Sequence, residues 1–321
     1  MRFCVQHKAL VVGMSQDPQL AMMLDAVSVF SEQTSVGNGE TKTALCYPLD
    51  AFEDIGARCL ALIQDAFEQL DVSIGNNPVL LITPQYGFQD EDTLTLWSQR
   101  LAQTQTELFG HPLSKIFPYG RSSLVMALSY ARELLQSNPD QVVWFVSVDS
   151  LGDRAILGDM MAQGILSNEQ GDGVVGSEGA MILGITSSDK GLAVCWSGSD
   201  AYLKTSGSDS LHHDQAVELL FRNVVEKVGQ PLDQIYLPDN GQDRLTNAWL
   251  HQYQVLAPVL TKETELHFTS VFTGELGSVG GLYRFLKIYE SYQLGRIEGT
   301  TLQCEISDKL YRAAALYQWH S

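Results

Sequence analysis

Cysteine is scarce in this sequence, and what there is forms no recognisable framework. The 321 residues include five cysteines, an odd number that is scattered along the chain without a Cys-x-x-Cys pair. This usage disfavours a disulfide framework and a zinc site, because both need closely spaced or even-numbered cysteines. We therefore expect a cytoplasmic protein that holds no metal.

Long apolar runs and nucleotide-binding motifs are also missing. No stretch is apolar and long enough to span a bilayer. The first residues, MRFCVQHKAL, lack the apolar core of a signal peptide, so we expect no membrane association. No Gly-x-Gly-x-x-Gly or Walker pattern is present, so the sequence predicts no nucleotide cofactor.

Positive charge is the third shortage. The chain has 20 Lys and Arg against 38 Asp and Glu, which gives a formal net charge of −18. An acidic surface repels phosphate backbones, so we expect no nucleic-acid partner. With 45% hydrophobic residues, the composition suits one large globular unit or two fused halves.

The chain is organised around the segment Tyr119–Ala131, YGRSSLVMALSYA. It follows a short predicted strand, Lys115–Pro118, and precedes an apolar predicted strand, Val142–Val148. Its own spacing predicts a sharp turn that enters a buried helix. Enzymes place nucleophiles at such turns, because a helix N-terminus favours negative charge. Here the residue at the turn is the cation Arg121.

Helices and strands are predicted in the same order twice, which indicates an internal duplication with halves 1–186 and 187–321. Thr34–Glu40 is expected to be a polar loop and Gly152–Gly173 a long loop. The other predicted strands are Ala9–Gly13, Pro78–Thr83, Ala180–Ile185, Leu192–Trp196, Gln234–Leu237, Glu265–Phe268, Leu302–Ile306 and Ala313–Gln318. The other predicted helices are Leu20–Phe30, Asp50–Leu70, Asp92–Phe109, Ser210–Val228 and Gln242–Gln252. Thr273–Gly281 is predicted to be a glycine-rich turn that leads into a last helix, which ends at Leu294.

Four motifs in order resemble those of one superfamily. They are Gly120–Leu128 (GRSSLVMAL), Gly176–Ala180 (GSEGA), Tyr236–Arg244 (YLPDNGQDR) and Gly274–Gly281 (GELGSVGG). Together they are similar to the thiolase-like superfamily, in particular to ketoacyl-ACP synthases of the type III kind. The resemblance implies an α/β fold of two duplicated halves in five layers, αβαβα. It also implies a dimer that pairs through the strand Leu113–Phe117, which is otherwise an exposed edge.

The same resemblance places a different residue at each catalytic position of the family. The nucleophilic cysteine falls on Arg121, the catalytic histidine on Asp239, and the asparagine or second histidine on Glu275. Arginine is no nucleophile, and carboxylates are poor donors to an oxyanion. We interpret the three as a salt-bridged plug in a disused site; the alternative is three unrelated solvated residues.

The same resemblance gives possible roles to two further residues, Ser122 and Arg244. Ser122 is next to Arg121, and some relatives are acyltransferases that use serine, so Ser122 is the alternative nucleophile. It would need Asp239 or Glu275 as its base, and otherwise it is a helix cap. Arg244 matches the arginine at the tunnel mouth of relatives, where carrier phosphopantetheine or coenzyme A approaches, or else it forms a surface salt bridge.

The favoured functional hypothesis is a catalytically inactive, chain-length-factor-like subunit. It would partner an active ketoacyl synthase in type II fatty-acid, polyketide or polyene biosynthesis, with acyl carrier protein or acyl-CoA as further possible partners. The alternatives are an acyltransferase or hydrolase that uses Ser122, and a non-catalytic homodimer that holds an acyl group. Ser307–Arg312, SDKLYR, lacks the glycine-rich loop of many relatives, which favours an inactive protein.

Overall fold

A computed structural model shows an α/β fold with one continuous path of paired strands. It describes residues 1–13, 17–23, 31–37, 39–85, 91–167, 173–202 and 214–321. The strands follow the order β10-β9-β11-β12-β8-β1-β7-β6-β4-β5. The link in the middle is short: β1 and β8 pair only through Arg2 with Ala193 and Phe3 with Leu192. The path therefore divides naturally into two sheets of five strands.

The two sheets have the same internal pattern of strand directions. In the first sheet β4 lies parallel to β5 and β6, and β7 lies antiparallel to β6 and β1. In the second, β9 lies parallel to β10 and β11, and β12 lies antiparallel to β11 and β8. The strands are β1 Arg2–Val12, β4 Val79–Ile82, β5 Lys115–Phe117, β6 Val143–Ser150, β7 Gly176–Ser188, β8 Gly191–Ala201, β9 Leu232–Tyr236, β10 Glu265–His267, β11 Thr300–Ile306 and β12 Tyr311–His320.

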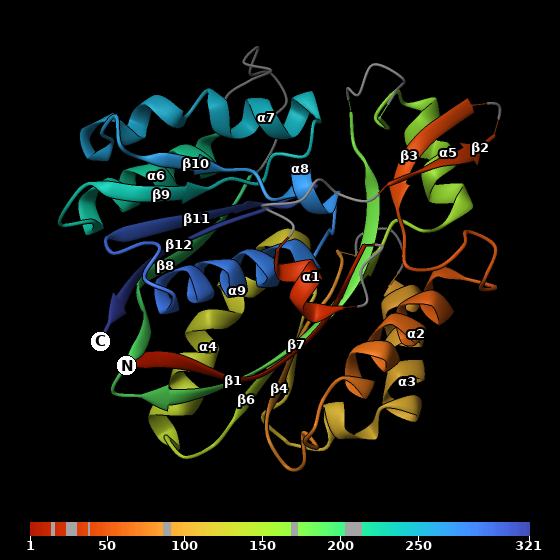
Figure 1. The fold of residues 1–321 in the computed structure, drawn as a ribbon, viewed down its shortest axis with the longest axis horizontal. Coiled ribbons are helices and arrows are strands. Elements are labelled where there is room, and N and C mark those ends of the chain that lie inside the picture. The colour runs from red at the N-terminus through yellow and green to blue at the C-terminus, as the bar shows by residue number, and fades with distance from the viewer. Residues whose placement is uncertain (14–16, 24–30, 38, 86–90, 168–172, 203–213) are drawn as a thin grey trace.

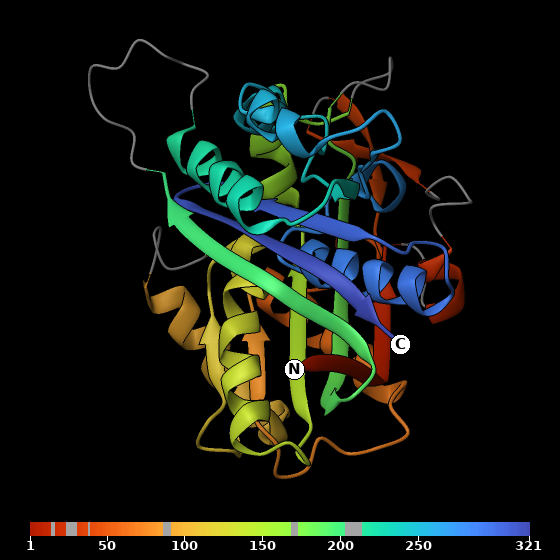
Figure 2. The same ribbon diagram turned by 90° about the vertical axis from the view of Figure 1, so that its left-hand side faces the viewer.

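Helices form the remaining three layers (Figures 1 and 2). The central helices α4 (Ser123–Ser137) and α9 (Val279–Gln293) lie between the two sheets and contact strands of both. Helices α2 (Ile55–Glu68) and α3 (Glu91–Thr104) cover the outer face of the first sheet, while α6 (Gln215–Lys227) and α7 (Asp243–Leu250) cover that of the second. The expected five-layer αβαβα arrangement is confirmed.

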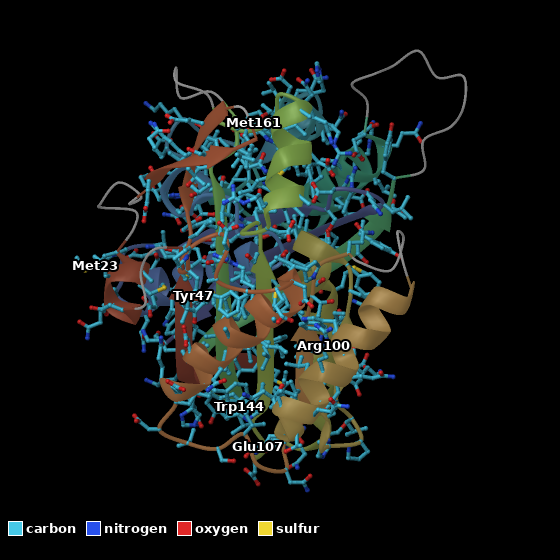
Figure 3. All side chains as sticks on the ribbon, turned by 90° about the vertical axis from the view of Figure 1, so that its right-hand side faces the viewer. Met23, Tyr47, Arg100, Glu107, Trp144 and Met161 are labelled. Atoms are coloured by element: carbon cyan, nitrogen blue, oxygen red, sulfur yellow. The ribbon has the colours of Figure 1, made fainter. Side chains whose placement is uncertain are left out.

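Each interface between layers has its own apolar core. Leu124 and Leu128 of α4 pack with Leu282 of α9 in the central core, and both helices are buried there because their apolar residues face both sheets. The outer cores are smaller, because their helices keep a polar face toward solvent. On that face Arg100 of α3, labelled in Figure 3, forms an ion pair with Asp54, the N-cap of α2. The two side chains are 2.7 Å apart.

Two segments that were expected to be loops are ordered elements. Part of Thr34–Glu40 lies in the hairpin β2 (Glu32–Val36) and β3 (Gly39–Ala44), whose β3 continues the pairing of β7 at Gly176. Part of Gly152–Gly173 forms α5 (Arg154–Ala162), whose first turn is capped by the side chain of Asp153. Both predictions were wrong, and both elements lie together at one end of the molecule (Figure 1).

The remaining elements are short. They are α1 (Pro18–Met22), α8 (Ser270–Thr273), and the 3₁₀ turns at Thr106–Phe109, Gly120–Ser122 and Tyr253–Val259. Most of the predicted helix Leu20–Phe30 lies outside the described residues. Among the helices that are described, none has the length and apolar character needed to cross a membrane.

Candidate functional site

The site lies where the N-termini of the two central helices meet. Gly120 opens the 3₁₀ turn before α4 with φ +61°, a conformation that favours glycine. Gly277 precedes α9 with φ +56°, and a Cβ there would lie only 2.0 Å from Asp149 Oδ2. These two glycines therefore let the loops before both helices approach each other and the end of β6.

Arg121 and Glu275 form a buried ion pair between these two loops. Arg121 Nε donates to Glu275 Oε1 at 3.1 Å, and a second guanidinium nitrogen lies 2.9 Å from Oε2. The residues are only 5% and 7% exposed. Burial by itself would lower the pKa of Arg121, but the carboxylates of Asp308 and Glu275 outweigh it and hold that pKa well above its ordinary value. The guanidinium is therefore charged at every physiological pH.

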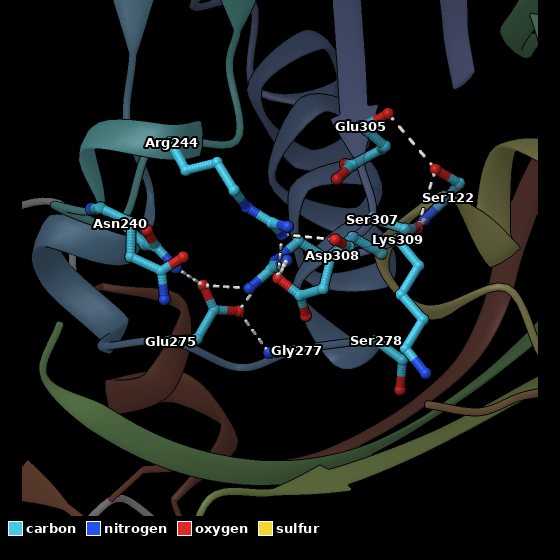
Figure 4. A network of polar contacts seen from close by, with 12 residues as sticks. Ser122, Asn240, Arg244, Glu275, Gly277, Ser278, Glu305, Ser307, Asp308 and Lys309 are labelled. Atoms are coloured by element: carbon cyan, nitrogen blue, oxygen red, sulfur yellow. Dashed lines mark hydrogen bonds and ion pairs between the residues drawn. The ribbon is translucent and has the colours of Figure 1, made fainter. Parts of the chain in front are cut away.

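Further donors use the remaining capacity of Glu275 (Figure 4). The backbone N–H of Gly277 donates to Oε1 at 2.6 Å, and the side-chain amide of Asn240 donates to Oε2. Asn240 follows β9, in the motif that was expected to supply the histidine position. Both oxygens of Glu275 are thus fixed by groups of this chain.

The loop between β11 and β12 closes the other side of Arg121. Asp308 in this loop accepts from Arg121 at 2.8 Å, and its Oδ1 lies 3.5 Å from a guanidinium nitrogen of Arg244. Arg244 also donates to the backbone carbonyl of Asp308 (Figure 4). Two guanidinium groups and two carboxylates therefore balance each other's charge.

The predicted cluster needs one correction at Asp239. Its carboxylate does not join Arg121 and Glu275; it accepts from Thr246 Oγ1 at 2.9 Å and from Trp249 Nε1 at 3.2 Å, both on α7. The backbone N–H of Gly241 also donates to it, at 3.1 Å. Its neighbour Asn240 reaches the cluster instead, with its side-chain amide on Glu275.

Ser122 is placed poorly for nucleophilic attack. Its side chain is fully buried, and Oγ lies 3.1 Å from the carbonyl oxygen of Tyr311 and 3.0 Å from Ser307 Oγ. The carbonyl oxygen of Glu305 is also near, at 3.3 Å. These partners are acceptors or another hydroxyl rather than a general base, so the geometry ties Ser122 to the β11–β12 loop. It is not a side-chain cap of α4 either.

A cleft of about 970 Å³ opens above the ion pair. Arg121, Glu275 and Asp308 line it together with Asp149, the penultimate residue of β6. Asp149 accepts from the backbone N–H groups of Ser278 at 2.7 Å and Ser150 at 2.9 Å. Burial raises the pKa of this carboxyl to about 7, and the nearby charge of Glu275 adds to the effect.

Sequence reasoning missed three of these residues. Asn240 is one position from the predicted Asp239, a shift that no pattern in YLPDNGQDR resolves. Asp308 lies in the segment that was noted only for its lack of glycine, although a carboxylate there was a usable signal. Asp149 lies one residue beyond the predicted strand Val142–Val148, whereas in the structure it belongs to β6 and accepts from the backbone N–H of Ser278 before α9.

The arrangement offers structural electrostatics rather than reactive groups. Across the described part of the chain, no group of three His, Cys, Asp or Glu side chains is placed to hold a metal ion. The five cysteines are elsewhere, in β1, after β3, in α2, in β8 and in β11, and all have free thiols. Arg121, which the family resemblance was expected to place at the nucleophile position, can stabilise negative charge but cannot form an acyl intermediate.

Comparison with known proteins gives a fold. No family model matches the chain, and no curated protein does. Among solved structures it is similar to the ishigamide ketosynthase/chain length factor, with a TM-score of 0.66 at 13% identity over 100% of both chains. It is similar to the ketosynthase ApeO with its chain length factor ApeC from Xenorhabdus doucetiae, with a TM-score of 0.68 at 11% identity over 99% of this chain and 98% of that one.

A modular synthase gives the same result. The ketosynthase from module 6 of the bacillaene synthase from Bacillus subtilis 168 matches with a TM-score of 0.73 at 12% identity, over 100% of this chain and 72% of that one. Identities this low carry no residue roles across. The chain has the thiolase-like fold that these ketosynthases and chain length factors share.

Proposed function

We propose that this protein is a non-catalytic, chain-length-factor-like subunit that pairs with an active ketosynthase. The observation that carries the proposal is the buried Arg121–Glu275 ion pair at the meeting point of α4 and α9, which the exposed carboxylate of Asp308 joins from the β11–β12 loop. In a condensing enzyme that point must hold a thiolate and free oxyanion donors. Here the guanidinium of Arg121 and the carboxylates of Glu275 and Asp308 occupy that point, and these groups bond to one another.

The charge of the chain supports a division of labour between two subunits. At −18 the protein would repel an acidic carrier protein, so the partner would bind the acyl carrier. Arg244 stays the candidate contact for a phosphopantetheine or coenzyme A phosphate, but it is engaged by Asp308. Five free thiols fit a reducing compartment, and we place the protein in the cytoplasm.

Intact-protein mass spectrometry tests the lack of catalysis. The purified chain is incubated with a panel of acyl-CoAs and acyl carrier proteins, beside a cysteine-bearing ketosynthase as the positive control. We expect an acyl adduct on the control and an unchanged mass for this chain. A stoichiometric adduct that disappears in Ser122→Ala would overturn the proposal and identify an acyltransferase or hydrolase.

A further inference from the structure

The cleft above the ion pair combines an apolar wall with charged side chains, and the proposed subunit role does not use this combination. Its volume of about 970 Å³ lies at the upper end of the roughly 300–1,000 Å³ that small-molecule pockets occupy. The apolar wall includes Leu151, Ile156 and Met160. The charged side chains are the carboxylates of Asp149, Asp243, Glu275 and Asp308 and the cations Arg121, Arg244 and Lys309. The cleft therefore suits an organic molecule with an apolar body and one polar end.

The other carboxylates of the cleft already have a counter-charge or lie in solvent. Glu275 and Asp308 are bound to Arg121, and Asp308 also lies beside Arg244. Asp243 is exposed in the first turn of α7. These three carboxylates are thus either neutralised by a guanidinium or hydrated, and none of them needs a further partner.

Asp149 differs from them, because within the described residues no lysine, arginine or histidine forms an ion pair with it. Its Oδ1 accepts from the backbone N–H of Ser150 at 2.9 Å, and its Oδ2 accepts from that of Ser278 at 2.7 Å. Each oxygen has two lone pairs, so each keeps one acceptor site. The residue is partly exposed, and it lines the cleft two positions before Leu151. An acceptor with spare capacity therefore lies in the same cleft as the apolar wall.

The charges around Asp149 favour a cationic partner. Glu275 acts on it as a second negative charge, while the nearby guanidinium of Arg121 is already matched by Glu275 and Asp308. Burial and the charge of Glu275 raise the pKa of Asp149 to about 7, so the ionised form lacks full compensation. An anionic ligand would be repelled there. A primary ammonium has three donors and no acceptor, so it meets the free lone pairs and supplies the missing charge.

We propose that this cleft binds an amphipathic primary amine, with the ammonium on the carboxylate of Asp149 and the apolar body along the wall. Ile156 and Met160 of that wall are one helical turn apart on α5, so they present one continuous surface to the body. The proposal goes beyond the subunit role and does not depend on a ketosynthase, because every residue named belongs to this chain. Binding by the isolated chain and assembly with a partner are separate measurements.

Isothermal titration of the full-length chain with matched probes tests the assignment. The probes are octylamine, octanol and octanoate, which share one alkyl chain and differ in the charge of the head group. At pH 8 an alkyl amine is protonated, as is lysine with its pKa of about 10.4. Salt at about 0.15 M screens attraction to the acidic surface. We expect octylamine to bind at least about tenfold more tightly than octanol, and octanoate to bind most weakly.

Three variants separate recognition from folding and from general charge. Asp149→Asn keeps the shape but removes the charge, so octylamine should lose about tenfold in affinity while octanol is unchanged. Asp50→Asn removes an exposed charge that does not line the cleft, and it should bind all probes as the wild type does. Met160→Gln should weaken octylamine and octanol by the same factor. Thermal unfolding of each variant confirms that it is folded.

The proton balance gives a second readout on the wild type, which requires no variant to fold. At pH 7 about half of the Asp149 carboxyls are protonated in the free chain. An ammonium favours the ionised form, so binding of octylamine should release up to about half a proton. At pH 9 the carboxyl is already ionised and the release should disappear. Binding heats in buffers of different ionisation enthalpy measure this release.

Four outcomes would overturn the proposal. The first is an affinity of the wild type for octanol or octanoate that equals its affinity for octylamine. The second is an unchanged preference for octylamine in folded Asp149→Asn. The third is octylamine binding without proton release at pH 7. The fourth is no binding of octylamine by the folded wild type at its solubility limit.

Discussion

At the residue scale, the fold opposes ionisation of the Asp149 carboxyl. The group is partly buried where it lines the cleft, and its neighbour Glu275 is a carboxylate that is fixed by Arg121. Backbone N–H groups of Ser150 and Ser278 favour the charged form, but burial outweighs them and raises the pKa to about 7. The carboxylate therefore binds its proton more tightly in the folded chain than in the unfolded chain, where the pKa of an aspartate is about 3.9.

We expect Asp149→Asn to flatten the pH dependence of stability. Because the folded pKa is raised, the contribution of Asp149 is fully present below about pH 4 and is lost as the pH rises through about 7. The loss is at most about 4 kcal/mol, from 1.36 kcal/mol for each pKa unit. The free energy of unfolding in urea, measured from pH 5 to 8, should therefore fall less with pH in Asp149→Asn than in the wild type.

A matched control is Asp50→Asn. Asp50 is exposed, and its hydrogen bond with Arg154 lowers its pKa, so this variant leaves the downward trend between pH 5 and 8 in place. An Asp149→Asn variant with the same slope as the wild type would show that the carboxyl is solvated in solution.

How far the sequence predicts the site also differs residue by residue. The family resemblance could place Arg121 and Glu275, because each lies in a glycine-marked motif before a long apolar helix. It could not place Asn240 and Asp308, because their contacts depend on how a strand end and a loop turn after the sheet has formed.

At the scale of elements, the two halves have ion pairs at matching positions with opposite polarity. Glu178 of β7 pairs across from Ser150, the last residue of β6, while Arg312 of β12 pairs across from Ile306, the last residue of β11. Glu178 binds Arg58 of α2, and Arg312 binds Asp214, the N-cap of α6, at 2.7 Å. In each half the ion pair connects the outer helix to the equivalent strand, which is β7 in the first sheet and β12 in the second.

We expect a non-additive stability cycle at the pair in the first half. Arg58 and Glu178 are 1% and 0% exposed and share two contacts, at 2.5 and 2.9 Å. Arg58→Met or Glu178→Gln alone leaves a buried group without its partner and should cost about 3–5 kcal/mol. The double variant removes both charges, so its cost in urea unfolding should fall clearly below the sum of the two.

The exposed pair Arg154–Asp50 is the control for this cycle. Its side chains are 52% and 74% exposed, so the same cycle there should give a coupling below about 1 kcal/mol. Costs that simply add at Arg58 and Glu178 would mean that the ion pair is not formed in solution.

The elements that could be predicted are those with strong periodicity. The helix Ile55–Glu68 and the strand Val143–Ser150 followed directly from apolar spacing. The hairpin Glu32–Ala44 is polar on both strands, so it lacks the alternation that indicates a strand. Helix Arg154–Ala162 is short and has glycine at its centre and after its end, which made it look like a loop.

At the scale of the whole molecule, each five-stranded sheet ends in a short parallel strand, β5 or β10. The carbonyl of Phe117 faces β4, where it accepts from Thr83 N at 3.2 Å, and the carbonyl of His267 faces β9, where it accepts from Leu237 N at 3.1 Å. Because backbone groups alternate along a strand, Ile116 and Leu266 turn their N–H groups outward. Both edges thus present one donor at the same position of the duplicated pattern.

For the proposed pairing with a ketosynthase, or with a second copy of this chain, we expect the β5 edge to form the interface, as the family resemblance implies. Ile116→Pro removes its outward donor while the bonds of Phe117 to β4 are kept. We expect this variant to be monomeric in light scattering, and to fail to co-purify with a ketosynthase that the wild type retains. Leu266→Pro makes the same change at β10 and should assemble as the wild type does, since association through β5 leaves β10 free. Assembly that survives Ile116→Pro but is lost in Leu266→Pro would move the interface to the second half, and assembly that survives both would rule out edge pairing at these strands.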